Sequence, residues 1–246
     1  MSKVSFKNFG YVSSISKNYT ISSSRYPHQK KYEKRILMNI IHNLKINKKD
    51  EVLDIGCNVG THLIPLYFKT KKIYGIDHKE CISVLKKRLP GISSKQLING
   101  NFLDKKIKKK FNKILCYSVL QYLKNEQELT FFVMKILKIL KKDGIVLLGD
   151  VPNVDLENNF FKSKKGKNWI KKFNFERKKS KNKNNIESIS YFLKNKTKDE
   201  FLVKINNKII KKLINKIKKN KKKVKRIKHS LNAAFGPTRE NIIVYN

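Results

Sequence analysis

The sequence has 246 residues, 39% of them hydrophobic, and a formal net charge of +40 at pH 7. This length suits one α/β domain with additions and is enough to bury a substantial core. Three widely spaced cysteines without a Cys-x-x-Cys pair argue against a disulfide framework and against a zinc site. No apolar run opens the chain as a signal peptide would or reaches the length of a membrane span, so we expect a cytoplasmic protein without a metal site.

The positive charge by itself suggests nucleic-acid binding. However, only six of the 58 basic residues are arginine, the side chain that binds phosphates and bases through a bidentate fork. Lysine, asparagine, isoleucine, phenylalanine and tyrosine all have A/T-rich codons, so genome composition can explain much of the lysine content. We interpret the lysines first as a solvated surface, and nucleic acid stays an alternative partner.

The N-terminal residues 1–27 are polar and aromatic and show neither a helical nor a strand period. They are interpreted as a loose segment that folds over a ligand cleft or as a disordered tail, and 1–35 is taken as an N-terminal cap. From His28 to Asn47 the apolar residues follow a helical period, and the main domain is assigned to 36–246.

The stretch Val52–Gly60 combines a short apolar strand with a glycine turn, a pattern typical of a ligand-binding loop at the carboxyl end of a strand. It matches neither the dinucleotide fingerprint, because Asn58 and Thr61 replace two glycines, nor a P-loop. Asn58 tolerates a left-handed backbone better than most non-glycine residues. The next strand ends in Asp77, whose spacing from the glycines suits a carboxylate that binds ribose hydroxyls; a helix N-cap is the alternative.

Further alternation of apolar patterns predicts a sequence of helices and strands. The expected helices are Thr61–Phe68, Glu80–Arg88, Glu128–Lys142 and one capped by Asn207, and the expected strands are Ile73–Asp77, Lys95–Ile98, Phe111–Tyr117, Ile145–Leu148, Phe201–Ile205, Lys223–His229 and Asn241–Tyr245. Residues 157–200 form a lysine- and asparagine-rich insertion with scattered aromatic residues. We interpret it as short helices at the domain edge; a substrate-covering insertion and base stacking are alternatives.

The segment Asp54–Gly60 resembles the first motif of class I S-adenosylmethionine-dependent methyltransferases, Asp/Glu-x-Gly-x-Gly-x-Gly, with Asn58 at the middle glycine. Ser118–Leu123 resembles the family stretch Ser-x-Val-Leu-His/Gln-x-Leu, and Gly149–Pro152 resembles an ending found in a bacterial small-molecule and surface-glycan subgroup. The resemblance implies a Rossmann-like three-layer sandwich, with a mostly parallel seven-stranded sheet and an antiparallel last strand. It also implies S-adenosyl-L-methionine as cofactor. The cofactor site is then expected to comprise Asp54, Gly56, Cys57, Asn58, Gly60, Asp77, Asn101, Phe102, Tyr117 and Ser118. Asn101 replaces the acid that accepts from the adenine amino group in the family, and Asp104 is the alternative.

Methyl transfer needs a positioned nucleophile more than a catalytic side chain. Asp150 is the candidate general base and Gln121 the candidate orienting residue, while a catalytic role for His62 is not favoured. The Asn/Asp-Pro-Pro-Tyr/Phe motif of amino-methylating enzymes is absent after Tyr117, which favours hydroxyl acceptors. We therefore predict an enzyme that methylates a small metabolite or a glycan precursor in polysaccharide biosynthesis. An RNA methyltransferase and a non-catalytic binding module are the alternatives.

Overall fold

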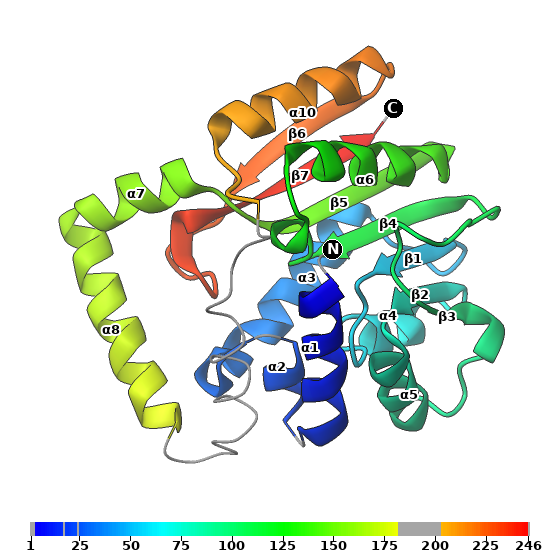
Figure 1. The fold of residues 1–246 in the computed structure, drawn as a ribbon, viewed down its shortest axis with the longest axis horizontal. Helices are drawn as coiled ribbons and strands as arrows, with labels where there is room; N and C mark the ends of the chain where they lie inside the picture. Colours follow the sequence, from blue (N-terminus) through cyan, green and yellow to red (C-terminus); the bar gives the residue numbers. More distant parts are fainter. Residues whose placement is uncertain (1–2, 17, 24, 182–202, 246) are drawn as a thin grey trace.

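The structure, a computed structural model, describes residues 3–16, 18–23, 25–181 and 203–245. Its centre is a seven-stranded sheet with the strand order β3-β2-β1-β4-β5-β7-β6 (Figure 1). The strands are β1 (Val52–Ile55), β2 (Ile73–Asp77), β3 (Leu97–Asn99), β4 (Phe111–Tyr117), β5 (Leu140–Pro152), β6 (Lys223–Lys228) and β7 (Arg239–Tyr245). The strands β1 to β5 pair in parallel, and β7 is antiparallel to both β5 and β6. This confirms the predicted sheet with its reversed last strand.

Helices cover both faces of the sheet and create two apolar cores. On one face lie α3 (Glu33–Leu44), α4 (Leu63–Lys69) and α5 (Lys79–Arg88), and on the other lie α6 (Glu126–Lys138) and α10 (Asn207–Lys219) (Figure 1). Successive strand residues alternate between these cores: Val52 packs with α3 to α5, and Leu53 packs with α6 and α10. The predicted three-layer α/β sandwich is therefore confirmed.

The N-terminal residues are more regular than predicted. They form two helices, α1 (Lys3–Ile15) and α2 (Tyr19–Ser22), and a 3₁₀ helix, η1 (Pro27–Tyr32). The helix α1 packs against α5, where Gly10 lies so close to His78 that no side chain would fit between them, and Ser13 Oγ lies 3.3 Å from Cys81 Sγ. Tertiary packing thus stabilises a helix whose sequence has no clear apolar stripe.

The first part of the lysine-rich insertion forms a helical arm beside the sheet. It consists of α7 (Val154–Lys162) and α8 (Lys164–Lys181) (Figure 1). The rings of Trp169 and Phe173 are stacked with centroids 5.0 Å apart, and Phe160 and Phe161 contact Trp169. The predicted helices that pack their own aromatic residues are thus present as far as residue 181; Tyr191 and Phe192 lie outside the described residues.

Several predicted boundaries are wrong because of tertiary pairing. The helix predicted over Glu128–Lys142 ends at Lys138, since Leu140 already pairs with Phe111 at the start of β5. The helix predicted from Thr61 begins only at Leu63. The strand predicted over Lys95–Ile98 begins only at Leu97, because the short 3₁₀ helix η2 (Ser94–Gln96) precedes it. Two further 3₁₀ helices among the described residues are η3 (Leu120–Tyr122) and η4 (Gly236–Thr238).

Two expectations near α10 are also corrected. Residues 203–206 are irregular rather than a strand, and Val203 N–H donates to the Leu123 carbonyl at 2.9 Å. Residues 201–202 lie outside the described range. The N-cap of α10 is Asn206, whose Oδ1 accepts from Ile209 N–H, and Asn207 is the first helical residue. Within the described segments, no helix has the length and apolar character needed to cross a membrane.

Candidate functional site

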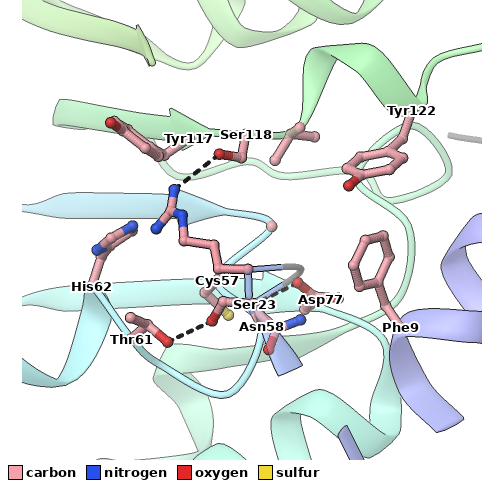
Figure 2. A pocket seen from close by; sticks show the side chains of 13 residues that line it. Phe9, Ser23, Cys57, Asn58, Thr61, His62, Asp77, Tyr117, Ser118 and Tyr122 are labelled. Atoms are coloured by element: carbon pink, nitrogen blue, oxygen red, sulfur yellow. Dashed lines mark hydrogen bonds between the residues drawn. The ribbon is translucent and has the colours of Figure 1, made fainter. Parts of the chain in front are cut away.

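A pocket lies at the carboxyl ends of β1, β2 and β4, the edge at which open α/β sheets bind ligands (Figure 2). The loop after β1, the end of β4 and the N-terminal segment all contribute side chains to it. It is lined by Phe9, Ser23, Arg25, Gly56, Cys57, Asn58, Thr61, His62, Asp77, Tyr117, Ser118, Val119 and Tyr122. Six of the predicted cofactor-site residues are therefore brought together here: Gly56, Cys57, Asn58, Asp77, Tyr117 and Ser118.

The loop after β1 has a left-handed backbone at three positions. The φ angles are +77° at Gly56, +48° at Asn58 and +88° at Gly60. A Cβ atom on Gly56 would lie 2.5 Å from Val119 Cγ2, so a side chain is excluded at this point of the pocket wall. The predicted left-handed conformation of Asn58 is confirmed, and its Oδ1 accepts from the Val59 N–H at 2.7 Å.

Asp77 ends β2 at the pocket wall with its carboxylate held by the backbone. Its Oδ2 accepts from Asn58 N–H at 2.7 Å, and its Oδ1 accepts from His78 N–H at 2.6 Å. Burial raises the pKa of Asp77, and the two backbone donors oppose that rise. The Cys81 thiol is a further hydrogen-bond partner of the Asp77 carboxylate, and the lone pairs that remain can accept from a ribose hydroxyl group.

Asp54 and Gly60 were also predicted for the cofactor site, but neither lines the pocket. Gly60 lies at the end of the loop after β1, just before the turn that leads into α4. Asp54 is buried within β1, and its Oδ2 has no hydrogen-bond partner among the described residues. Burial, followed by the nearby Asp77 charge, raises the pKa of Asp54 to about 8, so this carboxyl group is mostly protonated at neutral pH.

A smaller, mostly apolar hollow continues the pocket on the other side of Gly56. It is lined by Ile55, Gly56, Ile76, Asp77, Gly100, Asn101, Phe102, Val119 and Phe132. Its apolar walls suit a flat aromatic base, and it includes the predicted Asn101 and Phe102. Asn101 Oδ1 accepts from Leu103 N–H at 3.1 Å, while Asp104 is exposed and lies outside this lining.

The ends of β4 and β5 meet in a buried polar cluster. Ser118 and Asp150 both have a left-handed backbone, with φ of +59° and +55°, and the Ser118 hydroxyl donates to Asp150 Oδ2. Such strain in non-glycine residues is typical of functional sites. Arg25 Nη2 donates to Ser118 Oγ at 3.3 Å (Figure 2) and lies 3.6 Å from Asp150 Oδ2. Gln121 Nε2 donates to the Ser118 carbonyl at 2.9 Å, although Gln121 does not line the pocket.

The charges around Asp150 determine its protonation. Burial would raise the pKa of Asp150, but Arg239, Arg25 and His229 outweigh burial and lower it. Nearby, burial first and Arg25 second lower the pKa of His62 to about 3, so its ring is neutral at physiological pH. Burial also raises the pKa of the Tyr117 hydroxyl. The site thus contains an ionised carboxylate, a neutral imidazole and a neutral phenol.

Sequence reasoning missed the residues that reach the pocket from the N-terminal segment. Arg25 is 5% exposed, and its Nε has no partner among the described residues. Ser23 Oγ lies 2.6 Å from Thr61 Oγ1, and the Phe9 and Tyr122 rings meet edge to face with centroids 4.9 Å apart. The aromatic residues of the segment were a signal, whereas nothing in the local sequence marks Arg25. Among the described side chains, no three His, Cys, Asp or Glu residues gather as metal ligands would.

Comparisons with known proteins agree with this fold. A family model described as a methyltransferase domain matches residues 28–193. The fold resembles an S-adenosylmethionine-dependent methyltransferase from Clostridium acetobutylicum (TM-score 0.57, 14% identity, 88% of this chain and 91% of that chain). It also resembles the plantazolicin methyltransferase BpumL (TM-score 0.57, 14% identity, 98% of each chain). A third similar structure is magnesium protoporphyrin IX methyltransferase from Synechocystis (TM-score 0.56, 13% identity, 99% of this chain and 95% of that chain).

Other matches are shorter. The chain spans 35% of the length of coclaurine N-methyltransferase and 48% of that of an amino pentose methyltransferase from Micromonospora echinaspora. No curated protein matches the sequence. The fold and the site define the class I S-adenosylmethionine-dependent methyltransferases, and the family match covers most of the domain. The chain therefore belongs to this methyltransferase-domain family.

The residues present fit an adenosyl cofactor. Gly56 leaves the space that a side chain would fill, and Asp77 presents free lone pairs beside it. The apolar hollow around Phe102 adjoins both residues and suits the base.

Proposed function

We propose that this methyltransferase transfers the methyl group of S-adenosylmethionine to a hydroxyl group on a small metabolite or on a glycan precursor. The observation that carries the proposal is the pocket in which the glycine loop, Asp77 and Ser118 lie together, with Asp150 behind Ser118 and accepting its hydroxyl hydrogen bond. A cofactor bound there would lie beside Ser118 at the end of β4, in a pocket that the N-terminal segment helps to line.

The cofactor-binding roles follow from position. Asp77 would hold the ribose, because its two backbone hydrogen bonds orient both carboxylate oxygens. Phe102 and Asn101 would contact the adenine from the apolar hollow. Arg25 would bind a carboxylate group of the ligand in the main pocket, since its Nε is buried without a partner among the described residues.

When bound, the cofactor supplies a methyl group on a positively charged sulfur with a good leaving group. The acceptor oxygen would take this methyl group, and the thioether left behind would keep the electron pair of the carbon–sulfur bond. The chain's main contribution is to hold the acceptor within about 3–3.5 Å of the methyl group and to exclude water. The N-terminal residues Phe9, Ser23 and Arg25 are suited to the second task, because they cover the pocket.

Asp150 is proposed to receive the proton that the hydroxyl group releases. Its lowered pKa keeps it ionised at neutral pH, which is the state that a base requires. A hydroxyl group becomes strongly acidic as it takes up a methyl group, so even a weak base can receive its proton. Gln121 would orient this site through the Ser118 carbonyl.

Hydroxyl acceptors are favoured over amines because Tyr117–Leu120 stands where amino-methylating enzymes have their Pro-Pro motif. The similar structures act on plantazolicin and on magnesium protoporphyrin IX by name, and at their low identity they bear on the fold alone. A role in polysaccharide biosynthesis and a cytoplasmic location are further parts of the proposal. So is the division into an N-terminal cap, 1–35, and a methyltransferase domain, 36–246, with a lysine-rich insertion at about 157–200. The lysine content alone favours an RNA acceptor, and it is tested below.

Calorimetry with S-adenosylhomocysteine tests the cofactor site. Asp77→Ala removes two charged hydrogen bonds to the ribose, so we expect binding to weaken by about 2–3 kcal/mol. Asp143→Ala, an exposed acid in the β5 region, is the matched control and should bind as the wild type does. Thermal melting of both variants checks that they fold. Equal affinity of Asp77→Ala and wild type would remove the ribose assignment.

The acceptor class is tested by mass spectrometry with a methyl-deuterated cofactor. A panel of sugars and nucleotide sugars, each with an amino counterpart, is incubated with the protein. We expect the deuterated methyl group on hydroxyl compounds; transfer to the amino counterparts alone would contradict the hydroxyl assignment.

A further inference from the structure

An open groove lies between α3 and the edge strand β6, on the side of the sheet opposite α10. Its volume is about 340 Å³, which falls within the range of small-molecule sites, ~300–1,000 Å³. The walls come from the polar stripe of α3, from β6 and from the segment that follows β6. The groove shares Tyr117 and Asp150 with the methyl-transfer site and extends beyond it to α3 and β6.

The α3 wall is polar although it faces another element. Arg35, Asn39 and His42 are spaced by four and three residues, so they lie along one stripe of the helix. The neighbouring stripe, with Ile36 and Ile40, packs in the core. A polar stripe that lines a groove instead of a convex surface can contact a bound ligand along its length.

The β6 wall is basic for a similar geometric reason. Alternate residues of the strand face opposite sides, so Lys225 and Ile227 line the groove while Arg226 reaches Glu240 and Asn207 elsewhere. Lys228 ends the strand at the same groove. Two lysines on β6 therefore stand opposite Arg35 on α3.

The charges in this groove are not balanced by acids. Among the described residues that line it, Asp150 is the sole carboxylate, and Arg25 and Arg239 already lie 3.6 and 3.7 Å from its Oδ2. Cations that converge across a concave surface concentrate positive potential there, unlike lysines spread over a convex surface. The overall charge of +40 therefore does not by itself explain this arrangement.

The floor of the groove leads to the methyl-transfer site. Tyr117 lines both the groove and the cofactor pocket, and Asp150 lines the groove while it accepts from Ser118 of the pocket. A molecule in the groove would thus have one end among the basic side chains and the other end at Tyr117 and Asp150.

We propose that this groove binds the methyl acceptor and that the acceptor is a small anion, with a phosphate or carboxylate group held by Arg35, Lys225 and Lys228. The assignment rests on the proposed methyl transfer and narrows its substrate class. The anionic group binds at the outer end, and the reacting hydroxyl group lies at the inner end beside Asp150.

Calorimetry on the full chain, saturated with S-adenosylhomocysteine, tests this assignment. The probes are glucose 6-phosphate and glucuronate, which distinguish phosphate from carboxylate, and glucose serves as the uncharged control. We expect at least one charged sugar to bind and glucose not to bind. The double variant K225Q/K228Q should weaken binding of the charged sugar at least fivefold. R35Q, on the opposite wall of the groove, should also weaken it.

The matched control is K218Q/K219Q, which removes the same charge from the end of α10 and should leave binding within twofold of wild type. Equal weakening in both double variants, or no binding of either charged sugar, would overturn the proposal. So would a single-stranded RNA oligonucleotide whose binding is lost in K225Q/K228Q alone, because the groove would then serve a nucleic acid. Titration of S-adenosylhomocysteine into the same proteins separates the two proposals. If S-adenosylhomocysteine does not bind, the proposed function is contradicted. If it binds and neither charged sugar binds, only the groove assignment is contradicted.

Discussion

Asp54 has an unusual environment for a carboxyl group, because it is buried in β1 close to a second acid, Asp77. Its raised pKa means that the folded chain holds a proton which the unfolded chain has already released at neutral pH. The contribution of Asp54 to the free energy of unfolding is fully present below its pKa in the unfolded chain, about 4. This contribution is lost progressively as the pH rises toward its pKa in the folded chain, about 8. Asp54 thus makes the fold less stable in mildly alkaline solution.

Asp54→Asn should remove this pH dependence. We expect the free energy of unfolding of the variant to rise relative to wild type between about pH 4 and pH 8, by at most about 1.4 kcal/mol per pH unit, and to stay level above that range. Urea denaturation across this pH range measures the difference. Asp143→Asn, an exposed control, should follow wild type at every pH. If the curves of Asp54→Asn and wild type run parallel, Asp54 titrates with an ordinary pKa in the folded chain.

At the scale of elements, α1 contributes directly to the site. Its packing on α5 places Phe9 against Tyr122 of η3 at the pocket, with ring centroids 4.9 Å apart. Two aromatic rings from elements far apart in sequence therefore meet at the pocket wall. This contact is expected to slow the release of a bound cofactor, because it must open before the ligand leaves.

Phe9→Ala should therefore speed the dissociation of S-adenosylhomocysteine. Loss of an aromatic pair costs about 0.5–1.5 kcal/mol, which corresponds to roughly a two- to tenfold faster dissociation rate. Stopped-flow fluorescence measures this rate. Tyr11→Ala on the same helix, where the side chain is 45% exposed, is the control and should leave the rate unchanged. An unchanged rate in Phe9→Ala would show that α1 does not retain the ligand.

On the scale of the whole molecule, the charge of +40 must attract polyanions to some degree. The attraction of lysines to phosphates is non-specific and arises from the release of counterions. We therefore expect weak binding of single-stranded RNA that falls at least tenfold between about 50 and 200 mM salt. Fluorescence anisotropy measures this, and DNA of the same sequence should bind equally well. Tight, salt-tolerant binding to one RNA sequence would instead favour an RNA acceptor.

The sequence predicted those features of the fold that depend on a few neighbouring residues. The parallel strands are short buried apolar runs, so β2 and β4 were predicted with their observed bounds, and β1 was predicted within the stretch Val52–Gly60. The left-handed turn at Asn58 and the acid at the end of β2 were also predictable, because backbone conformation and strand ends depend on few residues. Boundaries such as the end of α6 were not, since pairing of Leu140 with Phe111 competes there with the helical pattern.

By itself, the amino-acid sequence determined most helices and strands and the loop that places Gly56 and Asp77 at one pocket, because apolar periodicity and glycine turns act over short stretches. The three-layer fold followed from the resemblance of its motifs to the methyltransferase family. Only the tertiary structure decided that α1 forms a helix, that Arg25 reaches Ser118 and Asp150, and that basic residues of α3 and β6 share one groove. These contacts join residues far apart in the chain, and the free energy of such packing leaves no periodic trace in either segment alone.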